Sequence, residues 1–385
     1  MKKLFFLMPF ALLAFASCSN DEVETKAVQK SADAVNFLPA MNNATRGAIY
    51  TDAGFSSDPG EFAVIASGSF YTGADYNTAS VAGAVSSYSN TVTYNAGAWS
   101  LPTDKKLWWT DGTTAGKFTA YAPKDYTVSS GTLSFAVEGT IANQKDLVVA
   151  YNEGSRNDFT SGVPLHFRHA LSQIIVNASY ADEADETLYP KSTFPTKTIK
   201  VQKIRFNNLS GAGALTLPTA STASGESYTP AWAPTSSTTS YTSSEISGGL
   251  TLSSAPQNLL TADGAMLLLP QTQSPAASLA SIPSTGAYLE VYVDINDGST
   301  DYYPNTADTY EWIAVPVTIS WDGGYKYTYT LNFSNIACGK VSPNATNLSG
   351  KQKGDDVISG VPYPVNFLVT VEDTWQDGGT TTPTL

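Results

Sequence analysis

The sequence predicts an all-β protein, and three observations support this fold class. The 385 residues are rich in Tyr, Thr, Ser, Val and Gly, which favour strands and turns. No window places apolar residues at helical spacing for more than a turn or two. Short apolar or alternating segments are instead separated by clusters of Gly, Pro and Ser, which is typical of β-sandwiches or barrels.

The predicted strands run through the whole chain. The clearest alternation lies in residues 287–295, where apolar side chains share one face and Tyr, Glu and Asp share the other, as in a half-buried antiparallel strand. The thirteen predicted strands are Val35–Leu38, Glu61–Ser67, Lys106–Trp109, Gly116–Tyr121, Asp146–Tyr151, Leu165–Ala178, Thr198–Asn207, Leu250–Leu252, Met266–Leu269, Tyr288–Ile295, Trp312–Ser320, Tyr325–Phe333 and Val365–Val371.

Two further patterns predict how the strands are connected. The sequence Asp322-Gly323-Gly324 is a turn signal, so we expect Trp312–Ser320 and Tyr325–Phe333 to form one hairpin. The stretch from Pro218 to Ser254 is dominated by Ser, Thr, Gly and Pro, and it is predicted to be a long loop or insertion.

The N-terminus carries an export signal. Two lysines after Met1 precede an apolar run from Leu4 to Phe15 and the small residues Ala16 and Ser17, in the order of a signal peptide. The apolar run is too short to span a bilayer as a mature helix. Cys18 follows directly and resembles the lipidated cysteine of bacterial lipoproteins, so residues 1–17 would be removed and Cys18 would become the lipid-bearing N-terminus. A plain signal peptide with an incidental cysteine is the alternative.

Composition restricts the possible partners and the source of stability. With Cys18 lipidated, Cys338 is the one remaining thiol, so no intramolecular disulfide can form and stability must come from burial. The length allows two domains, and we expect a boundary near residues 155–162. A net charge of −13 with 14% charged residues argues against nucleic acid and against docking on anionic lipid.

The sequence offers little catalytic chemistry. His166 and His169 are the two histidines, and residues three apart on a strand face opposite ways, which argues against a shared metal. No Gly-rich phosphate loop follows a strand, and no nucleophile is paired with a base. The acidic run 182–186 is predicted to be a solvated turn, and Trp108 and Trp109 to lie one in a core and one at an edge. We expect no enzyme activity, cofactor or metal.

Several segments in this order resemble the fimbrillin family, the subunits of fimbriae made by Bacteroides-type bacteria. These are Ala34–Ala40 followed by Ala44-Thr45-Arg46-Gly47-Ala48, Asp146–Ala150, Leu165–Val176, Gly323–Leu331, and Val365–Val371 with Trp375. The resemblance implies two β-sandwich domains of transthyretin-like topology. We therefore divide the chain into a signal peptide (1–17), a propeptide with a removable strand (18–46), an N-terminal domain (47–160) and a C-terminal domain (161–385).

The resemblance also implies how the chain is assembled. Lipid on Cys18 would carry the precursor to the outer membrane, and an Arg-specific protease would cut between Arg46 and Gly47. The cut would remove the strand Val35–Leu38 and open a groove, which a C-terminal strand of a neighbouring fimbrial subunit would fill. The expected product is a surface fimbrium that serves adhesion.

The C-terminal segment has the features that such a donor strand needs. A donor must supply alternating apolar side chains and a full backbone hydrogen-bond ladder. Val365, Phe367, Val369 and Val371 share one face of an extended strand. The tetrapeptide Val-Asn-Phe-Leu occurs both at 35–38 and at 365–368.

Three questions stay open at this point. The chain could be a stalk or a tip subunit, since residues 373–385 do not end as a clean strand. A monomeric surface lipoprotein that binds glycans through Trp108 or Trp232 is the alternative function. The family resemblance identifies no adhesion ligand.

Overall fold

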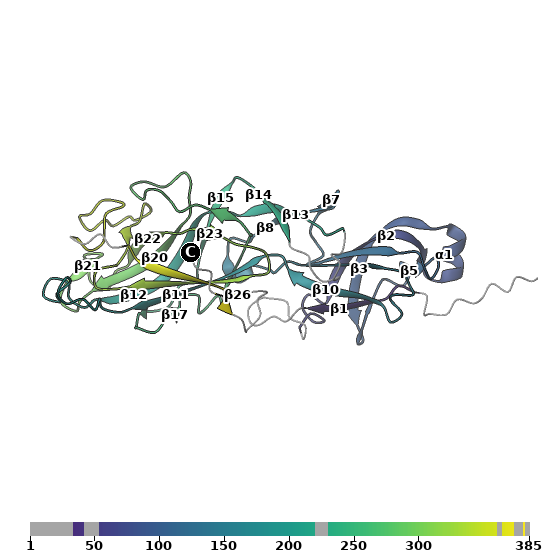
Figure 1. Ribbon diagram of the computed structural model, residues 1–385, viewed down its shortest axis with the longest axis horizontal. Coiled ribbons are helices and arrows are strands. Elements are labelled where there is room, and N and C mark those ends of the chain that lie inside the picture. Colours follow the sequence, from purple (N-terminus) through teal and green to yellow (C-terminus); the bar gives the residue numbers. More distant parts are fainter. Residues whose placement is uncertain (1–33, 42–53, 220–229, 360–363, 373–379, 382–385) are drawn as a thin grey trace, which may run out of the picture.

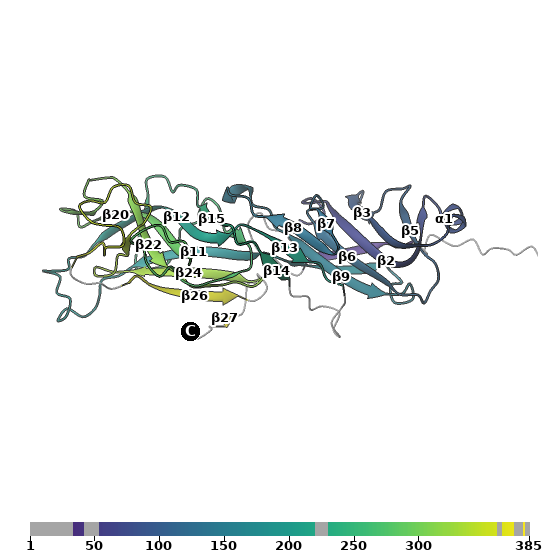
Figure 2. The same ribbon diagram turned by 90° about the horizontal axis from the view of Figure 1, so that it is seen from above.

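The computed structural model describes residues 34–41, 54–219, 230–359, 364–372 and 380–381. Within these residues almost all regular structure is β, which confirms the predicted fold class; the transthyretin-like topology stays a prediction. The molecule is elongated, with α1 (Tyr76–Ala82) near one end and β21 (Asp301–Tyr303) near the other (Figures 1 and 2). No helix in the described part is long and apolar enough to cross a membrane.

The N-terminal half is built on one eight-stranded sheet. Alternate residues of its strands, such as Phe62 and Val64 or Phe118 and Ala120, point into a single apolar core. The order is β1-β10-β9-β6-β2-β3-β4, with β5 also paired to β2. Its strands are β1 (Phe37–Met41), β2 (Glu61–Gly73), β3 (Val85–Asn95), β4 (Ala98–Ser100), β5 (Lys106–Trp109), β6 (Gly116–Ala122), β9 (Val148–Gly154) and β10 (Val163–His169).

The C-terminal half is a sandwich of a six-stranded and a seven-stranded sheet around the largest core. One sheet has the order β17-β11-β24-β26-β27 with β18 beside β11, and the other β15-β12-β20-β22-β25 with β16 and β21 attached. The first contains β11 (Ser172–Tyr180), β17 (Gln257–Asn258), β18 (Met266–Leu268), β24 (Lys326–Phe333), β26 (Asn366–Glu372) and β27 (Thr380–Thr381). The second contains β12 (Thr198–Ser210), β15 (Thr238–Thr242), β16 (Leu250–Thr251), β20 (Tyr288–Asn296), β21, β22 (Glu311–Pro316) and β25 (Lys340–Val341).

A four-stranded sheet joins the two halves. It consists of β7 (Val128–Ser129), β8 (Thr132–Ala136), β13 (Ala212–Thr216) and β14 (Ala231–Pro234), in the order β14-β13-β8-β7. Beneath it lies a third apolar cluster that takes residues from both halves, among them Tyr121 and Leu267. The chain passes from the N-terminal sheet to the C-terminal sandwich at residues 170–171, since β10 pairs with β9 and β11 pairs with β24. The domain boundary near residues 155–162 stays a prediction. A two-stranded sheet of β19 (Thr272–Gln273) and β23 (Ile319–Ser320) and a 3-10 helix (Ile141–Asn143) complete the structure.

The predicted hairpin of Trp312–Ser320 with Tyr325–Phe333 is wrong. β22 pairs with β20 and β25 in one sheet, whereas β24 pairs with β11 and β26 in the other. The turn at Asp322-Gly323-Gly324 therefore connects two layers of the sandwich. The hairpin is not needed because each of the two strands has one apolar face. Packing these faces against each other from opposite sheets removes them from water as well as a hairpin would.

Two other predictions need correction. The stretch 218–254 contains strands β14, β15 and β16, and Tyr241 from β15 is only 1% exposed in the core. The strand Tyr288–Ile295 has its predicted apolar face inward, but it is not half-buried: on its other face Tyr288, Glu290 and Asp294 are all 1% exposed or less.

Candidate functional site

The residues predicted from the sequence fall into two groups. Cys18, Arg46 and Gly47 lie outside the described residues. The removable strand and the donor candidate are described, as β1 and β26. They lie on different sheets of the molecule, so the structure does not bring them together within one chain (Figure 1).

β1 is a parallel strand beside β10. Its register places Phe37 opposite Val163 and Met41 opposite Phe167, and the Val163 N–H donates to the Asn36 carbonyl at 2.8 Å. On the other side the contact is brief: Ala34 bridges Trp108, and the Val35 N–H donates to the Leu107 carbonyl at 2.8 Å. β1 therefore spans the opening between β10 and the first residues of β5.

The side chains of β1 complete the N-terminal core. Val35, Phe37 and Met41 are 5%, 3% and 4% exposed, whereas Leu38 on the outer face is 47% exposed. The Phe37 ring lies 6.3 Å from the Phe62 ring and 5.8 Å from the Phe118 ring, both edge to face. Edge-to-face pairs at these separations add to the free energy of burial.

The wall that receives β1 is aromatic and was not among the residues predicted from the sequence. Phe167 of β10 lies 5.3 Å from Phe62 and 4.8 Å from Phe55, ring centre to ring centre. The alternation within β10 carries a signal that could have revealed it, because Val163, Leu165 and Phe167 occupy every second position and all are buried. Without β1 this wall and the free backbone edge of β10 would form an apolar groove.

β26 is the last but one strand of its own sheet. It pairs antiparallel with β24 from Asn332 opposite Asn366 to Lys326 opposite Glu372, and among the described residues its partner on the other side is the two-residue β27. Val365 just before the strand is 3% exposed, while Phe367, Val369 and Val371 are half-buried against the C-terminal core. The donor candidate thus has its apolar residues on one face, as predicted.

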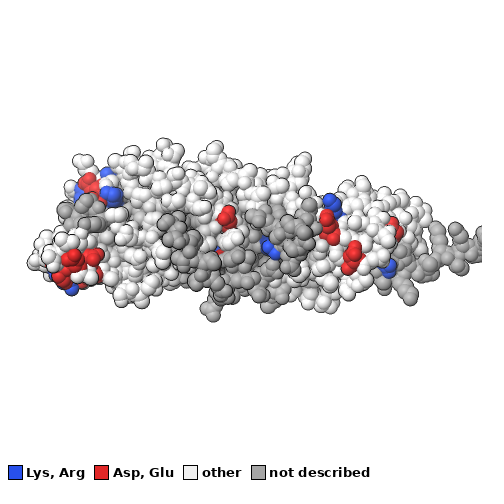
Figure 3. Space-filling view, viewed as in Figure 1, with Lys and Arg blue, Asp and Glu red and all other residues white. Residues whose placement is uncertain are grey.

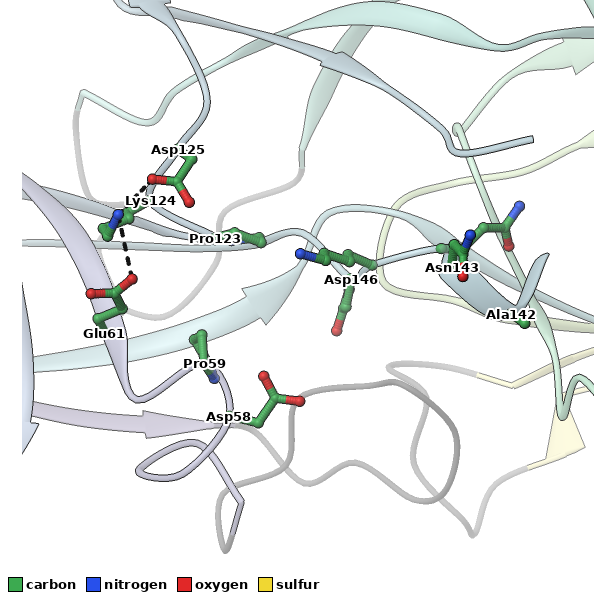
Figure 4. Close-up of a pocket in the computed structure, with 11 residues that line it drawn as sticks. Asp58, Pro59, Glu61, Pro123, Lys124, Asp125, Ala142, Asn143 and Asp146 are labelled. Atoms are coloured by element: carbon green, nitrogen blue, oxygen red, sulfur yellow. Dashed lines mark hydrogen bonds and ion pairs between the residues drawn. The ribbon is translucent and has the colours of Figure 1, made fainter. Parts of the chain in front are cut away.

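A cavity lies near the joint between the halves. It has a volume of about 550 Å³, and Figure 4 shows Lys124 between Glu61 and Asp125, with ammonium-to-carboxylate distances of 3.4 and 2.5 Å. Asp146 also lines it, and the Asp146 carboxylate lies 2.5 Å from the buried His169 Nδ1. Among the described residues no group of three His, Cys, Asp or Glu side chains could hold a metal ion.

The two histidines and the tryptophans can now be placed. His166 is exposed and His169 is buried, on opposite faces of β10 as the spacing predicts. Trp108 and Trp109 are both buried, at 7% and 3% exposure, so the expectation of one at an edge is wrong and Trp108 offers no stacking surface. Trp232 is half-buried, donates from Nε1 to the Ala170 carbonyl at 2.7 Å, and lines a cavity of about 430 Å³.

Several buried groups have displaced pKa values that reflect packing. Burial raises the pKa of the Cys338 thiol to about 12, so this thiol stays protonated at physiological pH. Burial also raises the pKa of Tyr241 to about 12. Charged side chains on the face shown in Figure 3 are sparse and lie in small groups, in keeping with the 14% charged residues of the sequence.

Comparison with known proteins agrees with these features. The model of the fimbrillin-like family matches residues 63–349. A crystal structure of a fimbrial protein from Bacteroides vulgatus is 14% identical, with a TM-score of 0.51, covering 89% of this chain and 99% of that one. A candidate cell adhesion protein from Bacteroides uniformis is 16% identical, with a TM-score of 0.39, covering 90% and 100%. A search of curated protein sequences finds no match. Since the family model spans well over half of the sequence, this chain belongs to the fimbrillin-like family.

Proposed function

We propose that this protein is a structural subunit of cell-surface fimbriae that polymerises by strand exchange and serves adhesion. The observation that carries the proposal is β1: a short segment that fills the N-terminal core with three side chains while pairing fully with one strand only. A segment held in this way can be exchanged for another strand of the same pattern. Membership of the fimbrillin-like family supports the same role.

The proposed precursor is a lipoprotein. The signal sequence 1–17 would be removed, Cys18 would carry lipid into the outer membrane, and an Arg-specific protease would cut after Arg46. The cut would separate residues 34–41 from the rest of the chain. Val35, Phe37 and Met41 are each worth about 2 kcal/mol of burial, so an empty groove would cost on the order of 6 kcal/mol.

A donor strand restores this loss. Removal of β1 leaves one edge of β10 unpaired, while β9 stays on the other side, and it exposes the rings of Phe62 and Phe118. The donor candidate, Val365, Phe367, Val369 and Val371, supplies apolar side chains at every second position and a continuous backbone without proline. In its own sheet three of these four side chains are half-buried, so they are less completely buried there than Val35, Phe37 and Met41 are in the N-terminal core.

This role is structural, and we propose no enzyme activity for the chain. A monomeric, glycan-binding lipoprotein is the second candidate, and the Trp232 cavity is the observation that favours it, since Gln271 and Asp322 place polar groups beside that indole. Trp108 is excluded from this alternative by its burial.

The proposal is tested by Arg46→Ala in the native host. The variant is expected to reach the cell surface as a folded lipoprotein that gives no polymer ladder on gels run without boiling, because β1 stays in its groove. Lys26→Ala is the matched control, since it changes another basic residue of the same propeptide. Filaments from Arg46→Ala would contradict the proposal.

A further inference from the structure

Each half of the molecule sends an arm into the other half at the joint. The N-arm, residues 137–147, connects β8 to β9 and carries Ile141, which is 5% exposed within the C-terminal core. The C-arm, residues 212–219, follows β12 and carries Leu215, which is fully buried in one apolar cluster with Tyr121 of the N-terminal sheet. Each half therefore completes the apolar packing of the other.

A backbone ladder ties the C-arm to the N-terminal half. β13 pairs antiparallel with β8 over five residues, and Figure 1 shows the two strands between the halves. One further backbone bond extends the ladder at each end. The Val137 N–H donates to the Gly211 carbonyl at 2.8 Å, and the Leu217 N–H donates to the Gly131 carbonyl at 2.9 Å. Rotation of one half against the other would have to break this ladder.

The end of the C-arm is held at a second place, against β6 and β9. Thr119 Oγ1 donates to the Pro218 carbonyl at 3.0 Å, and the Tyr151 hydroxyl donates to the Thr219 carbonyl at 2.8 Å. The Lys117 ammonium also donates to the Thr219 carbonyl, at 3.5 Å. All three donors belong to strands of the N-terminal sheet, so the C-arm is fixed along its length and not at one point.

The N-arm is held in a corresponding way by the C-terminal half. Gln144 is 3% exposed, and its Oε1 accepts from the Leu267 N–H of β18 at 2.8 Å. Thr140 forms a β-bridge with Thr242, the last residue of β15. Breaking the Gln144 bond without opening the site to water would leave a buried amide and a buried N–H without partners, which is costly.

We propose that these reciprocal arms lock the two halves at one angle, so that the subunit is a rigid rod with no hinge at residues 170–171. Halves that meet only through a linker and a small polar interface usually move relative to each other. Here the ladder, the carbonyl contacts and the shared apolar cluster would all have to break before the angle changed. Such rigidity is a property of the single subunit, whether or not it polymerises.

The distribution of distances between two spin labels, measured by pulsed electron paramagnetic resonance, tests this rigidity. Ser89→Cys on β3 and Thr251→Cys on β16 place one exposed label in each half. Thr239→Cys with Thr251→Cys is the matched pair within the C-terminal half. The full chain carries Cys18→Ser, and Cys338 is buried, so the introduced thiols are the ones labelled.

Both pairs should give a single distribution of the same width. A distribution across the joint that is broader than the one within the C-terminal half, or that has two peaks, would overturn the proposal. The unmodified joint therefore decides the question without any change to the arms.

Variants of the arms test whether they are the cause. Ile141→Ala with Leu215→Ala removes one apolar side chain from each arm and should broaden the distribution across the joint roughly twofold. Ile199→Ala with Leu331→Ala is the matched control, because these side chains are 1% and 0% exposed in the C-terminal core, away from the joint. A folded arm variant that stays as narrow as the unmodified protein, or a control that broadens equally, would contradict the role of the arms.

Discussion

The sharpest prediction concerns the phenylalanines at the same place in the two Val-Asn-Phe-Leu segments. If one strand replaces the other, truncation of Phe37 should reduce the stability of the precursor most, and truncation of Phe367 should reduce the stability of the polymer most. We therefore expect Phe37→Ala and Phe367→Ala to have opposite effects in the two forms. Leu38→Ala is the matched control for the first, because Leu38 lies on the outer face and is 47% exposed.

The magnitudes follow from burial. Phe37 is 3% exposed between two rings, so its truncation in the precursor should cost about 3–5 kcal/mol. That loss corresponds to a drop in the melting temperature of the N-terminal half of roughly 10 °C. Phe367 is half-buried, so its truncation in the precursor should cost about half as much. In the polymer Phe37 is gone and Phe367 should carry the larger cost.

Separate assays measure the stability of the precursor and of the polymer. Thermal unfolding of the purified precursor, followed by circular dichroism, should rank Phe37→Ala as the most destabilised and Leu38→Ala as nearly unchanged. The temperature at which the unheated gel ladder falls apart should drop for Phe367→Ala and stay unchanged for any Phe37→Ala protein that is processed. Equal effects of both variants on the ladder would refute the reasoning.

Three further predictions concern stability and ionisation. The Glu290 carboxylate is fully buried, accepts hydrogen bonds from Arg205 Nε at 2.6 Å and Asn207 Nδ2 at 2.8 Å, and also contacts Ser342. Glu290→Gln should lower the free energy of unfolding in urea by about 3 kcal/mol, whereas Glu245→Gln, which breaks the exposed pair with Lys203, should lower it by under about 1 kcal/mol. Equal losses for the two variants would contradict this prediction. Because burial raises the pKa of Cys338 from 9.0 to about 12, a thiol reagent at pH 8 should label this cysteine only after unfolding, and rapid labelling of the folded protein would show that the site is open. Burial raises the pKa of Tyr241 and Tyr327 from 10.0 to about 12, so their contribution to stability is complete below pH 10 and is lost as the pH rises toward 12. Absorbance at alkaline pH should show these tyrosines ionising together with unfolding. Their ionisation near pH 10 in the folded protein would contradict this prediction.

The sequence was a good guide to strands and a poor guide to their partners. Alternation placed Leu289, Val291 and Val293 on one inward face, as the structure confirms, because a period of two is a local property of the chain. Pairing is not local. The turn at Asp322–Gly324 connects two layers, and Leu165–Ala178 divides between two sheets, since both depend on which distant strand buries each apolar face.

The candidate site shows the same limit. The apolar faces of β1 and β26 could be predicted from the spacing of Val35 and Phe37 or of Val365 and Phe367. The buried face of β10 could be predicted in the same way, from Val163, Leu165 and Phe167. The parallel pairing of β1 with β10 and the contact of Phe167 with Phe62 could not, because they bring together residues far apart in the sequence. The Tyr241 strand was missed for a different reason: its Ser- and Thr-rich neighbours hide one buried ring in a segment that is otherwise polar.

The most direct test of strand exchange is the N-terminal sequence of subunits recovered from surface filaments, read beside an unheated gel. The account predicts a start at Gly47, with residues 34–41 absent and a ladder that collapses on boiling. A lipid-bearing start at Cys18 in protein that runs only as a monomer would contradict it.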